Sequence, residues 1–183
     1  MKMTSTATAV TTGTWVLDPT HTEIGFTVRH LMSKVRGKFD AFEGSIVTGE
    51  NIAHTKATAT IKLDSINTGT ADRDAHLRSS DFFGVDDNPE MSFESTGISV
   101  DGDNYTVSGN LTIKSVTKPV ELAVEFLGEG GDPWGGTRVG VEATTQISRK
   151  DFGIDFNIPL EGDKLMIGDK ILIHVTAEAV LQA

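Results

Sequence analysis

The chain has 183 residues, a formal net charge of −10 and no cysteine. This length fits one domain that buries a core without crosslinks, and the missing cysteines exclude disulfides and thiolate metal sites. The negative charge argues against nucleic-acid partners and anionic bilayer surfaces, and no apolar run is long enough for stable insertion into a membrane.

The first segment, residues 1–13, contains mostly Thr, Ser, Ala and Val. It lacks the continuous apolar stretch and the cleavage site of a secretory signal. We interpret it as a disordered leader that precedes a single domain over residues 14–183. Without an export signal, the chain is predicted to be cytoplasmic.

Strict alternation of apolar and polar residues predicts a series of strands with one buried face. Glycine is frequent, as suits many turns between strands, and Asp101-Gly102-Asp103-Asn104 predicts a tight hairpin turn. In chain order, the predicted strands cover residues 15–17, 22–28, 35–47 (bent at Gly37 and Gly44), 55–63, 91–95, 98–100, 105–113, 120–126, 137–148 and 171–180.

Two segments break the alternation. Residues 71–83 predict a short helix, which Thr70 or Asp72 caps and Gly84 ends, and residues 30–33 predict one helical turn. Successive strands joined by short turns indicate an antiparallel sheet. We therefore predict an all-β, up-and-down barrel of about eight strands with one or two short helices.

The predicted inward faces carry unusually small side chains, such as Ala57 and Ala59 or Ala177 and Ala179. Such faces leave two interpretations open: a dry core in which small residues pack against large ones, or an unfilled apolar interior that holds a ligand. The candidate walls of such a tunnel are Phe26, Val28, Phe39, Phe42, Ile61, Met91, Phe93, Leu111, Leu122, Val124, Val141 and Ile173. The candidate rim comprises His30, Leu77, Phe82, Phe83, Phe152, Ile154, Phe156 and Met166.

A local positive island stands out in this acidic chain. Between Glu23 and Asp40 there is no carboxylate, whereas Arg29, Lys34, Arg36 and Lys38 all fall in that stretch. Arg29 and Arg36 are candidates for holding a phosphate or phenolate head group at the tunnel mouth. The alternative is a solvated basic loop, or one paired with acidic neighbours.

Catalytic motifs are missing from the sequence. There is no Gly-x-Ser-x-Gly, no cysteine nucleophile and no phosphate-binding loop before a helix. The five histidines lack the short spacing of a zinc site. We predict no catalytic residue, no metal and no cofactor, although His30, at the end of an inward-patterned strand, is the candidate if the protein is an enzyme.

Several short motifs along the chain together resemble the YceI-like family of bacterial polyisoprenoid-binding proteins, and the resemblance extends from Trp15 to about Ala179. Any single motif is weak, whereas their order and spacing are specific. They are Trp15-x-Leu17-Asp18-Pro19-x-His21, Phe26-x-Val28-x-His30-Leu31, Gly37-x-Phe39, Phe42-x-Gly44, Asp81-Phe82-Phe83, Pro89-x-Met91-x-Phe93, Gly109-x-Leu111-Thr112-Ile113, Val116-Thr117-Lys118-Pro119-Val120 and Arg149-x-Asp151-Phe152-Gly153.

The resemblance implies a lipocalin-like, extended barrel whose apolar tunnel holds a polyisoprenoid, such as a quinone, a prenyl phenol or a prenyl phosphate, for storage, sequestration or transport. It also implies a homodimer. Many members of the family are exported, and this chain departs from them because we identify no export signal in it. The competing hypotheses are an enzyme acting on an isoprenoid-like substrate and a structural or stress-response module that binds nothing.

Overall fold

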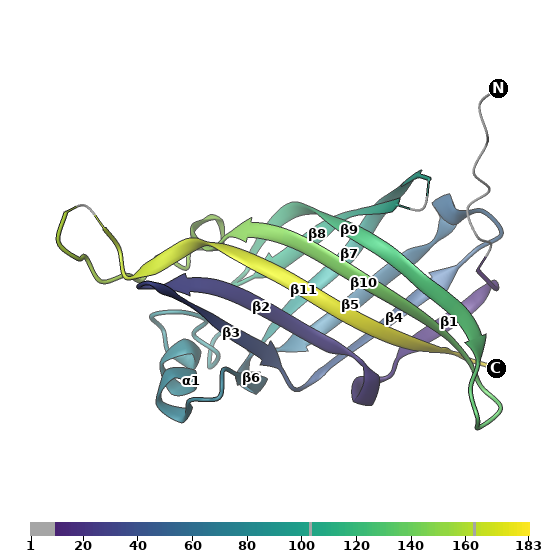
Figure 1. Ribbon diagram of the computed structural model, residues 1–183, viewed down its shortest axis with the longest axis horizontal. Helices are drawn as coiled ribbons and strands as arrows, with labels where there is room; N and C mark the ends of the chain where they lie inside the picture. Colours follow the sequence, from purple (N-terminus) through teal and green to yellow (C-terminus); the bar gives the residue numbers. More distant parts are fainter. Residues whose placement is uncertain (1–9, 103, 163) are drawn as a thin grey trace.

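Eight antiparallel strands close into an elongated barrel in the computed structural model, which describes residues 10–102, 104–162 and 164–183. The strands follow the order β1–β4–β5–β7–β8–β9–β10–β11, and pairing of β11 with β1 completes the ring (Figure 1). Their bounds are β1 Gly13–Leu17, β4 Phe42–Thr48, β5 Lys56–Lys62, β7 Glu90–Asp101, β8 Asn104–Ile113, β9 Val116–Gly131, β10 Thr137–Ser148 and β11 Ile167–Leu181.

A smaller sheet extension widens one end of the barrel. Strand β2 (Glu23–His30) pairs with the part of β11 that β1 leaves free, and β3 (Ser33–Phe39) and β6 (Ile66–Asn67) follow beyond it. The helix α1 (Ala71–Arg78) lies beside β3 and β6 at this end (Figure 1). Within the described ranges, no helix has the length and apolar character needed to cross a bilayer. In the part of the chain that the structure describes, single 3-10 turns cover Pro19–His21, Ile52–His54, Leu63–Ser65 and Arg149–Phe152.

The predicted all-β barrel is confirmed, with several local corrections. Residues 91–95 and 98–100 form one strand, β7, with an irregularity between Ser95 and Gly97. The predicted helical turn at residues 30–33 is wrong, because His30 and Ser33 pair as the last residues of a β2–β3 hairpin. The helix ends at Arg78, well before Gly84. Residues 1–9 of the predicted leader and Asp103 of the predicted turn lie outside the described residues.

Helix α1 begins without the predicted side-chain caps. Thr70 occupies the N-cap position but makes no side-chain cap bond. Instead, the buried carboxylate of Asp74 accepts hydrogen bonds from the backbone and hydroxyl of Thr68, at 2.9 and 2.5 Å. Acidic residues in the first turn and His76 and Arg78 in the last match the helix dipole.

Gly37 does not form the predicted bend. It is instead a position in β3 where a neighbouring side chain on β2 leaves no room for a Cβ atom. A Cβ atom at Gly37 would lie 2.4 Å from Cζ of Phe26, its cross-strand partner. The glycine therefore lets the Phe26 ring lie flat over β3. The chain turns instead at residues 40–41, between β3 and β4.

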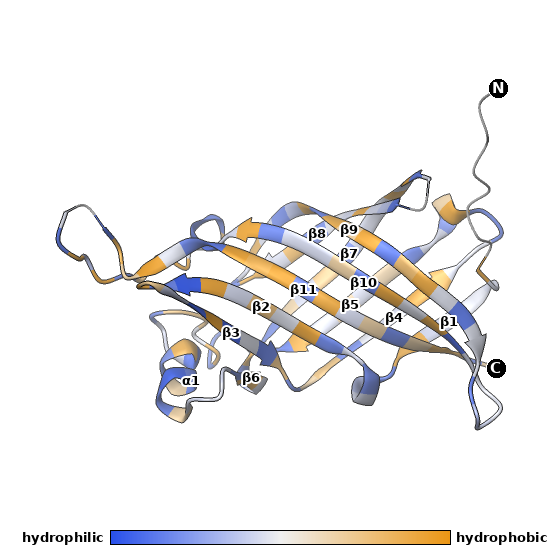
Figure 2. Ribbon diagram, viewed as in Figure 1, coloured by the Kyte–Doolittle hydropathy of each residue, from blue (hydrophilic) through white to orange (hydrophobic). Residues whose placement is uncertain are grey.

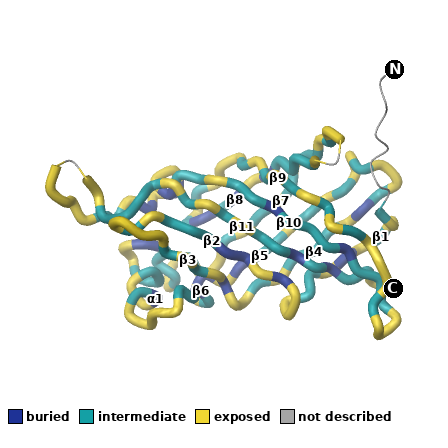
Figure 3. Tube along the Cα trace, in the orientation of Figure 1, coloured by how far each residue is buried: buried dark blue, intermediate teal, exposed yellow. Residues whose placement is uncertain are grey.

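In the described residues, buried side chains form three clusters, and the first two share the flanking side chains of Leu77, Phe83 and Met91. One surrounds Ile24, Phe39 and Leu63, a second surrounds Phe82 and Phe152, and a third surrounds Trp15. Apolar and polar residues alternate along β10 and β11 (Figure 2), yet most strand residues are only half-buried (Figure 3). A filled barrel of this size would bury its inward faces, so this pattern indicates open space inside.

Candidate functional site

The barrel interior contains a cavity of about 780 Å³. Its walls include the alanines that the alternating pattern places inward, Ala57, Ala59, Ala143 and Ala177, together with aliphatic side chains from β7 to β11. Trp15, which is 0% exposed, contributes to the wall, and its indole N–H donates to the hydroxyl of Thr48 at 3.1 Å. Of the two interpretations that the sequence left open, this cavity supports the unfilled apolar interior over the dry, packed core.

A second, smaller cavity of about 200 Å³ lies at the widened end. It is bounded by β2, by α1 and by the segment from the last 3-10 turn to the start of β11. Phe82 and Phe156 pack with ring centroids 5.3 Å apart, and His76 stacks edge-on against each at 5.0 Å. These contacts give this end a rigid aromatic wall.

The two cavities share three wall residues, Ile24, Met91 and Ile173. These side chains separate the two volumes, and Met91 is an unbranched side chain with three rotatable bonds. The two cavities are therefore adjacent, with Met91 at their boundary.

Most of the predicted wall residues line these cavities. Phe42 lines neither and packs against the cluster around Ile24 and Phe39. The large cavity is lined by Ile61, Phe93, Leu111, Leu122, Val124 and Val141, the small one by Phe26, Val28 and Phe39, and both by Met91 and Ile173. All predicted rim residues line the small cavity: His30, Leu77, Phe82, Phe83, Phe152, Ile154, Phe156 and Met166.

The predicted head-group residues Arg29 and Arg36 lie elsewhere. Both are exposed, and neither lines a cavity. Each is next in sequence to an inward residue of its strand, so each points outward. The cationic side chains that do line the small cavity are Arg73 and Arg149, which sequence reasoning did not select.

Arg149 is a buried cation held by backbone carbonyls. It is 4% exposed, and its guanidinium donates to the carbonyls of Gly168 (3.0 Å), Ile154 (3.1 Å) and Phe156 (2.8 Å). Burial lowers the pKa of this guanidinium, and the nearby carboxylates of Asp169 and Asp155 oppose that shift. Arg149 thereby fastens the segment that covers the small cavity. Arg149 stands two residues after Ile147, which the alternating pattern places inward, so the same pattern would have placed Arg149 inward as well.

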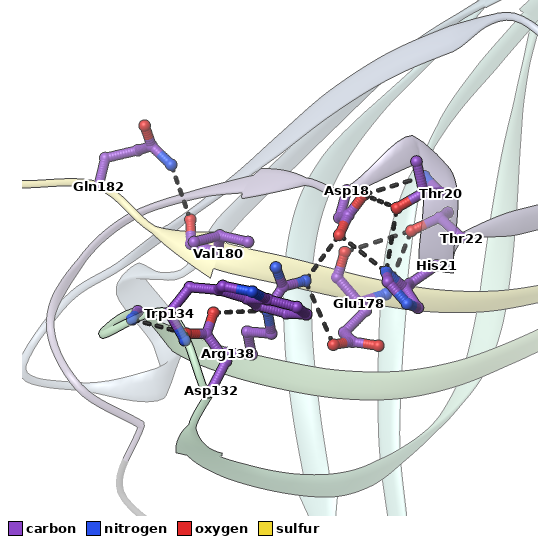
Figure 4. Close-up of polar contacts among 11 residues, drawn as sticks. Asp18, Thr20, His21, Thr22, Asp132, Trp134, Arg138, Glu178, Val180 and Gln182 are labelled. Carbon is purple, nitrogen blue, oxygen red and sulfur yellow. Dashed lines mark hydrogen bonds and ion pairs between the residues drawn. The ribbon is translucent and has the colours of Figure 1, made fainter.

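At the opposite end, the motif residues Asp18 and His21 belong to a structural network (Figure 4). The guanidinium of Arg138 donates to the carboxylates of Asp18 (2.6 Å) and Asp132 (2.8 Å), and the Asp18 carboxylate also contacts the His21 ring at 2.9 Å. The hydrogen bond from the Thr20 hydroxyl, followed by those from Arg138 and His21, holds the pKa of the Asp18 carboxyl well below its ordinary value. The network ties β1, the β9–β10 turn and β10 together.

A family model described as the YceI-like domain matches residues 15–179. A UPF0312 protein of Photorhabdus laumondii is 48% identical over 134 residues, covering 72% of this chain and 70% of that protein.

Two solved structures share the fold. BcnA of Burkholderia cenocepacia superposes with a TM-score of 0.78 at 20% identity, covering 88% of this chain and 98% of that one. A domain of Saccharophagus degradans described as polyisoprenoid-binding superposes with a TM-score of 0.68 at 17% identity, covering 92% and 98%.

Proposed function

Because the chain belongs to the YceI-like domain family, we propose that it binds a long apolar amphiphile, such as a polyisoprenoid, inside its barrel for storage, sequestration or transport. The observation that carries the proposal is the interior cavity of about 780 Å³ with apolar walls. Ligand pockets in proteins are typically about 300–1,000 Å³. The relative from Saccharophagus degradans, described as polyisoprenoid-binding, supports the ligand class.

An empty interior of this size would be energetically costly. Cavities left in apolar cores cost about 24 cal/mol per Å³, which for the volume of about 780 Å³ is roughly 19 kcal/mol on that scale. Domains are stable by only about 5–15 kcal/mol. Solvent or a ligand must therefore fill the space, and walls of Ala, Val, Leu and Phe favour an apolar ligand over water.

A polyprenyl tail offers only hydrocarbon surface, so its affinity depends on length. Large ligands gain about 0.3 kcal/mol per heavy atom after the costs of binding. A tail of about forty carbons could then bind with a Kd of about 1 nM. The head group would add comparatively little to this affinity.

Two experiments test the proposal. Protein purified from cells without detergent is extracted with organic solvent, and mass spectrometry should recover a lipid in near-stoichiometric amount. For equilibrium binding, a Trp134→Phe variant leaves Trp15 as the one tryptophan, and energy transfer from Trp15 to an apolar polyene probe should fall when a long-chain quinone displaces the probe. Absence of both a recovered lipid and probe displacement would reject the proposal; turnover of the ligand that His30→Ala abolishes would support an enzyme instead.

Three finer hypotheses accompany this proposal: transport of the ligand rather than storage, a cytoplasmic location and a homodimer. Cell fractionation tests the location, and light scattering of the purified protein tests the oligomeric state. Transfer of a labelled quinone from donor to acceptor vesicles, faster with the protein than without it, would support transport.

A further inference from the structure

Five exposed apolar side chains gather at the small-cavity end of the barrel. Leu31 and Met32 form the tip of the β2–β3 hairpin, and Met32 is fully exposed. Residues 157–162 and 164–166 form a finger that extends beyond the barrel (Figure 1), and it carries the exposed side chains of Ile158, Leu160 and Leu165. The Leu31 N–H donates to the Met166 carbonyl at 2.8 Å, which joins the two projections. We call these two projections the docking end.

The local turn does not explain the residues at the hairpin tip. Leu31 is the first of the two central residues of the hairpin turn and has a φ of 55°. Glycine is favoured at such a position, because a positive φ is unfavourable for residues with a Cβ atom. A leucine in this conformation costs roughly 1 kcal/mol or more, and its side chain, 46% exposed, gains little burial in return. An apolar tip that neither the turn nor the core requires points to a contact outside the chain.

The same hairpin carries the positive island of the sequence. Arg29, Lys34 and Arg36 are exposed, and among the described residues none of them forms an ion pair; Lys38 pairs with Asp40 at 3.7 Å. The finger itself is mixed in charge, with Asp155 just before it and Glu161 and Lys164 within it. The cationic surface of the docking end is therefore the hairpin.

The docking end is continuous with the candidate site. His30 and Met166 line the small cavity, and their chain neighbours Leu31 and Leu165 are exposed tip residues. An apolar molecule that left a bilayer at this end would meet cavity walls within one residue of the contact surface. At the Arg138 network, the exposed ring of Trp134 also lies over a cation, 5.7 Å from the Arg138 guanidinium, but there the carboxylates of Asp18, Asp132 and Glu178 surround that arginine and pair with its charge.

We propose that the docking end binds the surface of a bilayer that contains anionic lipids, and that the apolar ligand enters and leaves there. The second half of this inference rests on the proposed function. The Leu31 and Met32 side chains would enter the acyl boundary while Arg29, Lys34 and Arg36 contact lipid phosphates. The net charge of −10 does not prevent this, because salt screens charges beyond about 8 Å and the local island then dominates at contact.

Vesicle co-sedimentation of the full chain tests the docking. Binding should be strong to vesicles of phosphatidylcholine with phosphatidylglycerol and at least several-fold weaker to phosphatidylcholine alone. The double variant Leu31→Gly/Met32→Ser removes both apolar tips and places glycine at the position of positive φ, so it should fold at least as well. Its affinity for the anionic vesicles should fall at least about tenfold.

Matched controls lie on the rest of the surface. Leu127 is 53% exposed on β9, and Leu127→Ser should leave vesicle binding unchanged. Lys34→Glu should weaken binding about fivefold or more, whereas Lys56→Glu, at an exposed lysine of β5, should not. No binding to anionic vesicles, or equal loss in the controls, would overturn the inference. So would self-association that Leu31→Gly/Met32→Ser abolishes without vesicle binding, since the surface would then contact a second copy.

Failure of this inference and failure of the proposed function are distinguishable. Equilibrium affinity for a long-chain quinone, measured without vesicles, should be the same in Leu31→Gly/Met32→Ser and the natural sequence. Transfer of the quinone from anionic vesicles should be slower in the variant. If quinone binding is lost in every protein, the ligand assignment fails; if binding persists but transfer is equally fast in both, the entry route fails.

Discussion

The sign of one stability change distinguishes an open interior from a filled one. Ala177 and Ala179 lie on the same face of β11, but Ala177 lines the large cavity whereas Ala179, 1% exposed, packs against Trp15 and Val139. Ala177→Leu adds three carbons to open space, and burial of about 0.8 kcal/mol per carbon stabilises the ligand-free protein by about 2 kcal/mol. Ala179→Leu overpacks a filled site and should destabilise by about 1–3 kcal/mol.

Urea unfolding and calorimetry of delipidated protein measure both changes. For a domain of this size, about 2 kcal/mol corresponds to a rise in Tm of about 4–8 °C. Ala177→Leu should also weaken ligand binding, because the added side chain occupies space that the ligand needs. If both variants destabilise the protein equally, the interior is filled, and the argument from the cavity is refuted.

Three further predictions concern single residues. Met91→Phe should lower the affinity for long tails more than for short ones in probe displacement, because a rigid ring would hold the two cavities apart. Arg149→Met should destabilise the protein by about 3 kcal/mol in urea unfolding, because it leaves the buried carbonyls of Ile154 and Phe156 without donors. The fold lowers the pKa of the Asp18 carboxyl. The ionised carboxylate therefore contributes its full stabilisation above about pH 4, and this stabilisation is lost as pH falls through the lowered pKa. Asp18→Asn should thus reduce the free energy of unfolding most at pH 7 and progressively less in acid.

The direction of side chains along the strands could be predicted, because successive side chains of a strand point to opposite faces whatever the rest of the chain does. Ile171, Ile173 and Val175 were placed inward from alternation, and each lines a cavity. The same rule places Arg29 and Arg36 outward, since Val28 and Val35 beside them point inward. The hypothesis that these arginines hold a head group rested on their positive charge and did not use the alternation of side-chain direction along each strand. Residues 30–33 were misassigned because a two-residue hairpin with Leu and Met lacks the usual turn residues.

Whether the interior is open could not be predicted from sequence. The free volume depends on which strands close the ring, and the closing pair joins β1 to β11, Trp15 opposite Leu181. No local pattern specifies a contact across that sequence separation. Arg149 was missed for a related reason: its carbonyl partners lie in Ile154, Phe156 and Gly168, and only the folded segment brings them around it.

The separation of the two cavities leads to a prediction about ligand orientation. A tail that enters first at the docking end crosses the small cavity, passes Met91 and fills the large cavity beside Trp15, so the head remains near His30 and Arg73. In the Trp134→Phe variant, an isoprenoid brominated at the end of its tail should therefore quench Trp15 fluorescence strongly, and one brominated at its head should quench it weakly. Both compounds should displace the polyene probe equally, which controls for occupancy. Stronger quenching by the head-brominated compound would mean that the ligand lies in the opposite direction, and entry at the docking end would then require the polar head to pass the apolar constriction first.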